Sequence, residues 1–227
     1  VGWVIIDSMM NIPILYWASK VTKDPRFAQI ADAHADTVRK YLVREDGSVG
    51  HIASFNPETG EFEKILAGQG YSAESSWSRG QAWAVYGFAI AFGHTGKSEY
   101  LMAAKNIANY FIACVSQKGY LPLADFRAPD HPEKWDMSAG TCAACGLLEI
   151  AEHVGTHESK LYRSTAEKML MAIEHAYADW NPDTDGIIGH SSHSYHNSEE
   201  THVSMIYGDY FFIEAVLRLK GNVLTIW

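Results

Sequence analysis

Two kinds of helical segment alternate along this chain. Four segments are apolar on nearly every side, which predicts helices buried all round, and they cover residues 3–21, 77–94, 136–153 and 203–219. The three segments between them repeat apolar residues three and four positions apart, which predicts helices with one face in water, and they cover residues 24–43, 97–116 and 158–178. Buried helices inside and amphipathic helices outside indicate a mainly α fold, built of helix hairpins in two layers.

The connections between these segments are of two lengths. Short turns of similar sequence place Asp or Ser near a predicted helix N-cap, at residues 22–27, 95–100 and 156–162. Long connections are expected together at the opposite end, where functional sites are commonly built, and they cover residues 44–76, 117–135 and 179–202. In the first of them, residues 43–65 predict a short β-hairpin that turns at Asn56–Gly60.

Charge and cysteine content exclude several classes of protein. The 227 residues contain 18 Lys and Arg against 27 Asp and Glu, a net charge of −9. No basic face is visible, so we expect no nucleic-acid partner. The three cysteines are few and odd in number, so we do not expect a disulfide framework. No window reaches the about 18 apolar residues of a membrane span.

The first residues are those of a folded element rather than of a leader. The chain opens Val1-Gly-Trp-Val-Ile-Ile-Asp7, without Met and without the charged start of a signal peptide. We therefore expect residues 1–227 to form one domain that lacks its N-terminal part. Any signal region would lie in that missing part, so its absence here says little. We expect a cytoplasmic location rather than a periplasmic one, and the oligomeric state is left open.

Asp7 is the first candidate for chemistry. It stands among Val4, Ile5, Ile6 and Met9, where burying a carboxylate costs several kcal/mol unless it is paired or keeps its proton. A carboxyl group that keeps its proton can act as a general acid. The alternative is that Asp7 caps the start of a helix.

Arg79 is the second candidate. It shares one face of a predicted buried helix with Trp83, four residues later, and an Arg beside indole rings can fork onto a carboxylate while a ring packs on a sugar. The structural alternative is that Arg79 pairs with an acid of the chain, for which Glu74, Asp136 and Asp209 are the candidates. His51 on the hairpin is, taken alone, more typical of a structural histidine.

Other features carry no site. Cys142 and Cys145 form a C-x-x-C inside an Ala-rich segment with no second pair, which indicates small core residues. The spacing of the loop histidines matches no standard metal-ligand set, and these are His190, His193, His196 and His202. No nucleotide-binding glycine motif or nucleophile elbow is present. We therefore expect no metal and no cofactor.

Five motifs together resemble glycoside hydrolase family 88, the unsaturated glucuronyl hydrolases. They are Ile6-Asp-Ser-Met-Met-Asn11 with Tyr16-Trp-Ala18, Gly47-Ser-Val-Gly-His51, Gln69-Gly-Tyr with Trp77-Ser-Arg-Gly-Gln-Ala-Trp83, Asp136-Met-Ser-Ala139, and Ile206-Tyr-Gly-Asp-Tyr-Phe211. They span nearly the whole chain in the order of the family. The unsaturated rhamnogalacturonyl hydrolases, family 105, share a weaker version of the set and are the alternative.

The resemblance implies an (α/α)6 barrel, of which this chain would supply the C-terminal helices, about seven, plus the hairpin. It implies that Asp7 is the general acid and base. It implies that the substrate is an unsaturated uronyl oligosaccharide. The pocket that binds it would be lined by His51, Gln69, Trp77, Arg79 and, as an aromatic wall, Trp83. The implied reaction protonates C4 of a 4,5-unsaturated uronic acid and adds water at C5, without metal or cofactor.

The resemblance also bears on specificity and on alternatives. Sulfate-accepting members resemble Ser-x-x-Ser-x-Lys where this chain has Ser194, Asn197 and Glu199, so we expect a preference for unsulfated substrates. A sugar epimerase on the same barrel would rely on paired histidines, which the predicted inner helices lack. A non-catalytic helical-repeat binding module has the same periodicity but no need for Asp7, Trp77 and Arg79 at one end.

Overall fold

The computed structural model describes residues 2–222. Within them the chain forms seven α-helices, a 3-10 helix and a three-stranded sheet. The helices are α1 (Pro13–Thr22), α2 (Pro25–Tyr41), α3 (Ser78–Thr95), α4 (Ser98–Ser116), α5 (Met137–Glu152), α6 (Thr156–Tyr177) and α7 (Ile206–Leu219). The 3-10 helix is η1 (Ile6–Met10), and the strands are β1 (Gly2–Ile5), β2 (Ile52–Phe55) and β3 (Phe62–Leu66). The mainly α fold of helix hairpins is confirmed.

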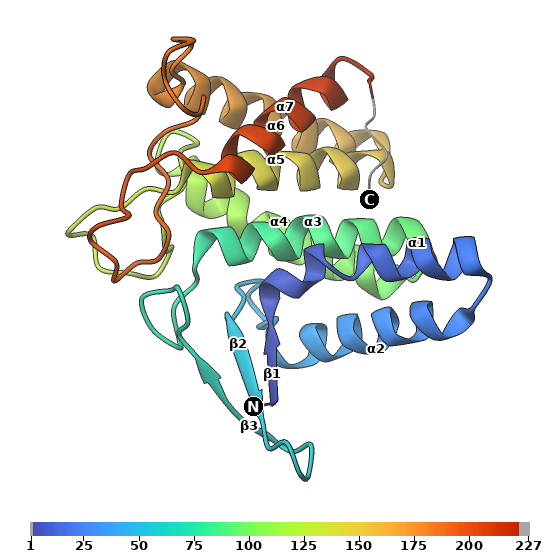
Figure 1. Ribbon diagram of the computed structural model, residues 1–227. Coiled ribbons are helices and arrows are strands. Elements are labelled where there is room, and N and C mark those ends of the chain that lie inside the picture. Colours follow the sequence, from blue (N-terminus) through green and yellow to red (C-terminus); the bar gives the residue numbers. More distant parts are fainter. Residues whose placement is uncertain (1, 223–227) are drawn as a thin grey trace.

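The helices lie in two layers. α1, α3, α5 and α7 pack side by side, and α2, α4 and α6 each cover the helix that precedes them in the chain (Figure 1). α3 and α5 form the centre, because every residue of α5 from Met137 to Leu148 is buried. Small residues bring these two helices close: a Cβ at Gly146 would lie 2.9 Å from backbone atoms of Tyr86.

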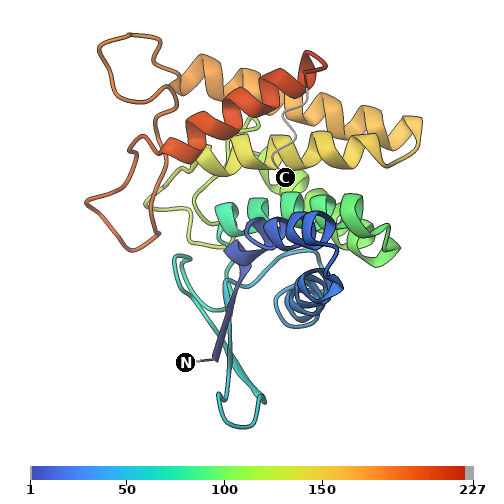
Figure 2. The same cartoon turned by 45° about the vertical axis from the view of Figure 1, so that its right-hand side comes forward.

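The first predicted helix is wrong over its first half. Residues 3–12 were expected to be helical, but Gly2–Ile5 form β1 and Ile6–Met10 form η1 before α1 begins at Pro13. The reason is a distant partner, since β1 pairs antiparallel with β2 in the register Ile5↔Ile52. β2 then pairs with β3, so the expected hairpin is present and gains a third strand. Figure 2 shows β1 running from the sheet directly toward α1.

Two of the helices expected to be buried all round are only half covered. On α1, Pro13 and Tyr16 are buried, whereas Ile14, Trp17 and Val21 are more than half exposed. On α7, Ile206 is 80% exposed. α1 and α7 are the two end helices of the inner layer. Among the described residues, each has one neighbouring inner helix instead of two, which leaves these apolar side chains uncovered.

The two ends of the helix stack differ as expected. The short turns lie at one end and the long connections at the other, at the left of Figure 1. Asp24 caps α2 by accepting a hydrogen bond of 3.0 Å from the Arg26 amide. Ser98 and Ser159 do not cap, because they lie inside the first turns of α4 and α6.

Candidate functional site

Asp7 lies at the start of the inner layer, at the end with the long connections. In η1, Ile6 and Met9 are three residues apart and buried, which turns Asp7 away from the core. Its side chain is 38% exposed, so the expectation of an acid enclosed by apolar neighbours is corrected. Its Oδ2 atom is nevertheless buried and lies 3.3 Å from Nε2 of His51.

Nδ1 of His51 has two backbone neighbours. The Gln69 N–H donates to it at 2.8 Å, and the Ala67 carbonyl lies farther away, at 3.2 Å. The shorter contact, with an N–H donor, favours the tautomer whose ring proton is on Nε2, the nitrogen that faces Asp7. Gly68 makes this contact possible. Its φ is +56°, and a Cβ there would lie 2.0 Å from Nδ1 of His51. The ring is also held from the side by Trp77, with ring centroids 4.5 Å apart.

A row of ring contacts continues from His51 into the core. The Arg79 guanidinium carbon lies 4.6 Å from the centroid of the Trp77 ring and 5.3 Å from that of Tyr207. Tyr207 in turn contacts Trp83 edge to face, with centroids 6.0 Å apart. The structure therefore brings four of the predicted site residues into one continuous row, in the order His51, Trp77, Arg79, Trp83. Cation–π contacts of this kind are strongest where water is excluded.

The guanidinium of Arg79 is buried and is held by the chain itself through both Nη atoms. Arg79 is 1% exposed, and its Nη1 pairs with Oδ2 of the buried Asp136. Nη1 also donates to the Ser192 carbonyl at 3.0 Å, and Nη2 donates to the His193 carbonyl at 2.7 Å. Of the three acids considered as partners, Asp136 is the one that pairs. Both Nη atoms therefore bind groups of the chain, and the buried guanidinium is not presented to the cavity beside Asp7.

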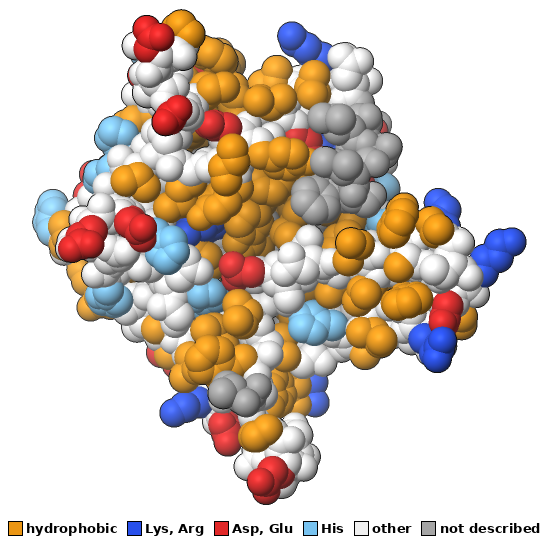
Figure 3. All heavy atoms as spheres, viewed as in Figure 1, with side chains coloured by type: hydrophobic (Ala, Val, Ile, Leu, Met, Phe, Trp, Pro, Cys, Tyr) orange, Lys and Arg blue, Asp and Glu red, His pale blue; other side chains and the backbone are white. Residues whose placement is uncertain are grey.

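Gln69 and Ser194 meet the site from two of the long connections. Nε2 of Gln69 donates to the His193 carbonyl at 2.6 Å, and the Gln69 carbonyl accepts from the Tyr195 amide at 2.8 Å. Ser194 lies between these two anchored residues and is half-buried. The structure places it in the same loop but not in the cavity beside Asp7. Histidine side chains gather along this side of the molecule (Figure 3).

A cavity of about 510 Å³ opens beside Asp7. It is lined by Trp3, Ile5, Asp7, Ser8, Asn11, His34, His51, Ile52, Gly68 and Gln69. Trp77, Arg79 and Trp83 stand behind it rather than in its wall. Sequence reasoning missed Ser8, Asn11 and His34. The available signal for His34 was a polar residue on the apolar stripe of residues 24–43, which was taken as a core position.

Three buried polar atoms among the described residues lack a hydrogen-bond partner around this site. They are Oδ2 of Asp7 and the indole Nε1 atoms of Trp77 and Trp83. A buried donor or acceptor without a partner costs about 1–3 kcal/mol. Oδ2 of Asp7 faces Nε2 of His51 at 3.3 Å, whereas the two indole N–H groups lie behind the cavity wall without a hydrogen bond to any described residue.

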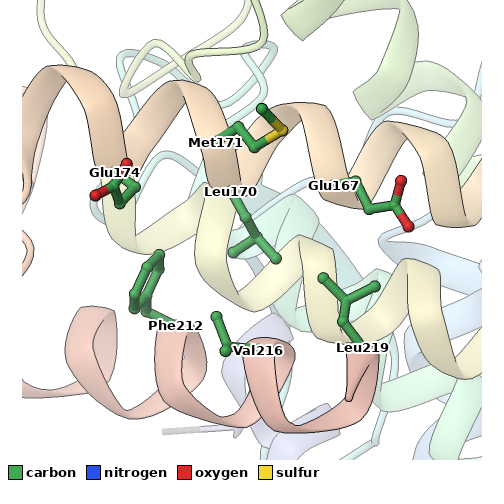
Figure 4. Close-up of a pocket in the computed structure, with 7 residues that line it drawn as sticks. All are labelled: Glu167, Leu170, Met171, Glu174, Phe212, Val216 and Leu219. Carbon is green, nitrogen blue, oxygen red and sulfur yellow. The ribbon is translucent and has the colours of Figure 1, made fainter. Parts of the chain in front are cut away.

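Other parts of the described chain offer less chemistry. No group of three or more His, Cys, Asp or Glu within residues 2–222 could hold a metal ion. Burial raises the pKa of both Cys142 and Cys145 well above the usual thiol range. A second cavity of about 350 Å³ lies between α6 and α7 (Figure 4), and its wall is mostly apolar, with Leu170, Phe212 and Val216 among its residues. None of the described helices is long and apolar enough to cross a membrane.

Comparison with known proteins agrees with this fold. The family model described as Glycosyl Hydrolase Family 88 matches residues 2–219. An unsaturated glucuronyl hydrolase of Bacillus sp. (strain GL1) is 36% identical over 230 residues, which cover 100% of this chain and 61% of the relative. An unsaturated chondroitin disaccharide hydrolase of Streptococcus pyogenes serotype M1 is 33% identical, covering 99% of this chain and 57% of the relative.

A solved structure of such an enzyme, a variant with dGlcA-Glc-Rha-Glc, superposes with a TM-score of 0.93 at 36% identity, covering 97% of this chain and 60% of that one. These matches define the class of protein as a glycoside hydrolase with an α/α fold. The chain belongs to glycoside hydrolase family 88, which confirms the resemblance of the motifs. It spans about three-fifths of the length of these relatives.

Proposed function

We propose that this protein removes a 4,5-unsaturated uronic acid from the non-reducing end of oligosaccharides produced by polysaccharide lyases. The observation that carries the proposal is the contact of Asp7 with Nε2 of His51 at the wall of a cavity in which the Asp7 carboxyl group is reachable. The relatives named for unsaturated glucuronyl and chondroitin disaccharides support the substrate class.

The reaction is a hydration followed by ring opening. The C4=C5 double bond of the substrate is an enol ether, so a proton given by Asp7 to C4 leaves positive charge at C5 that the ring oxygen shares. Water then adds to C5 and gives a proton back to the Asp7 carboxylate. The product is a hemiketal, which opens and releases the neighbouring sugar. One carboxyl group is sufficient, whereas ordinary glycoside hydrolysis uses a pair.

His51 fits the role of holding that carboxyl group. Its Nε2 lies 3.3 Å from Oδ2 of Asp7, which orients the carboxyl group and leaves Oδ1 to exchange protons with substrate and water. Because Nη1 and Nη2 of Arg79 already bind Asp136 and the His193 carbonyl, we assign Arg79 the tasks of anchoring that loop and supplying positive charge behind the site.

The test follows the ultraviolet absorbance of the C4=C5 bond conjugated to the carboxylate, with a lyase-generated disaccharide and the protein expressed from its complete gene. We expect the absorbance to fall as substrate is consumed. Asp7→Asn should lower kcat by about a thousandfold, within the range of general acid–base catalysis. Asp36→Asn, an acid on the surface of α2 that is 48% exposed, should leave kcat unchanged. An Asp7→Asn protein that keeps most of its activity would contradict the assignment.

Preference for unsulfated substrates is the second prediction. Glu199 and Glu200 are both exposed in the loop that carries Ser194, and carboxylates there repel a sulfate group on the neighbouring sugar. We expect kcat/KM to be higher for the unsulfated disaccharide than for its 6-sulfated form, and the ratio to shrink in Glu199→Lys. Faster turnover of the 6-sulfated form by the unaltered protein would refute the prediction.

A further inference from the structure

Helix α2 is joined to the turn that carries Asp7 by a contact between two polar side chains, His34 and Ser8. Nε2 of His34 lies within hydrogen-bond distance of Oγ of Ser8, and the Ser8 hydroxyl donates to the Ile5 carbonyl. Since the hydroxyl proton points to Ile5, the contact between the two side chains is a donation from the Nε2–H of His34. Burial lowers the pKa of His34, which agrees with a neutral ring that has one N–H.

Both neighbours of Asp7 in the chain are thereby fixed. On one side the Ile6 amide donates to the His51 carbonyl at 2.9 Å. On the other side Ser8 is held by His34. The Ser8 hydroxyl and the Ile6 amide bind on either side of Asp7, so the turn can neither rotate nor slide without breaking one of these hydrogen bonds. Among the described residues, no hydrogen bond or ion pair joins His34 directly to Asp7.

We propose that His34 is a positioning residue of this enzyme, which acts through the Ser8 hydroxyl to hold the Asp7 carboxyl group against His51. The inference rests on the proposed function for its kinetic consequences. It does not rest on it for the hydrogen bond, which exists whether or not the protein turns over an unsaturated sugar. Misplacement of a reacting group by about 1 Å can lower a rate a hundredfold.

The kinetic experiment pairs variants that remove the contact with variants that keep it. His34→Leu and Ser8→Ala remove it, and each should lower kcat by about tenfold to a hundredfold while KM changes less than twofold. His34→Gln and Ser8→Thr each keep a suitable donor or hydroxyl group and should recover most of kcat. The double variant His34→Leu/Ser8→Ala should be no slower than the slower single variant, because both changes break one linkage.

Thr37 supplies the matched control on the same helix. It lies three residues after His34, is half-buried, and its hydroxyl bonds within α2, to the Ala33 carbonyl at 2.8 Å. Thr37→Val should leave kcat unchanged. Additive losses in the double variant, or single variants that lose binding of substrate instead of kcat, would overturn the positioning role.

A measurement without substrate separates this inference from the proposed function. In protein labelled with ¹⁵N-histidine, nuclear magnetic resonance should show His34 protonated on Nε2, with exchange of that proton slowed. Ser8→Ala should speed the exchange, and Thr37→Val should not. If the protein consumes no unsaturated disaccharide, the proposed function fails while this spectrum still decides the linkage. A His34 ring protonated on Nδ1 would overturn the inference at any level of activity.

Discussion

At the scale of single residues, the position of the His51 ring depends on the absence of a side chain at Gly68. The backbone of residues 67–69 surrounds Nδ1 of His51, with the Gln69 amide donating to it at 2.8 Å. The φ of Gly68, +56°, is one that other residues rarely adopt. Gly68 lets the loop backbone approach Nδ1 of His51 closely, and this contact directs Nε2 of the ring at Asp7.

Gly68→Ala tests this arrangement. A Cβ 2.0 Å from Nδ1 of His51 must displace the ring, so we expect kcat for the unsaturated disaccharide to fall by about tenfold or more. Gly60→Ala is the control, because Gly60 also has a positive φ, +73°, but open space around its Cβ position. It should cost about 1 kcal/mol of stability and leave kcat unchanged. Equal kinetic effects of the two substitutions would contradict the account.

Which residues form the site could be predicted only in part. Two residues stood out in the sequence because charged groups in apolar segments are rare. They are Asp7, an acidic residue among apolar ones, and Arg79, which shares a helix face with Trp83. The pairing of Arg79 with Asp136 was one of three alternatives, since sequence spacing does not say which acid of a distant segment comes close. His34 was taken as a core position because a helical stripe does not reveal that one member reaches another element.

At the scale of elements, the 3-10 helix η1 places Asp7 by packing on α3. A Cβ at Gly87 of α3 would lie 2.5 Å from the Cβ of Met9 and 2.6 Å from its carbonyl oxygen. The glycine thus lets η1 approach the central helix closely. Since Met9 is two residues from Asp7, this contact sets the position of the Asp7 carboxyl group relative to α3.

Gly87→Ala should lower the free energy of unfolding by about 1–3 kcal/mol, as for other overpacked sites, and lower kcat as η1 moves. Gly93→Ala on the same helix is the matched control, since its Cβ would meet only Glu149 and His153 side-chain atoms at 3.7 and 3.8 Å. Alanine is the better helix former, so that variant should be at least as stable as the parent. Thermal unfolding and kcat of both variants check this, and a Gly87→Ala protein as stable as Gly93→Ala would refute it.

The elements that could not be predicted are those with distant partners. Helices α2, α4 and α6 follow from the local spacing of apolar residues, and α3 and α5 follow from segments that are apolar on nearly every side. The apolar residues of β1 fit either a buried helix or a strand. The strand forms because β1 pairs with β2, where Ile5 lies opposite Ile52. The same limit hid η1, the element that carries the central acid.

At the scale of the whole molecule, the helix layers bring three long connections to one end (Figure 1). The alternation of buried and amphipathic segments made this arrangement predictable. The contacts between the loops were not, because the Gln69 side chain and Arg79 meet at the carbonyl of His193, more than a hundred residues later. The site is thus assembled from segments that have no periodicity of their own.

The central claim is that the reaction begins with a proton delivered to C4 of the unsaturated sugar. The most direct measurement is hydrolysis in heavy water, quenched within the first turnovers and followed by nuclear magnetic resonance of the released uronic acid product. The account predicts deuterium bound to C4 at the first observation, with its incorporation slowed in Asp7→Asn in proportion to the loss of kcat. Release of the neighbouring sugar with only hydrogen at C4 would contradict it.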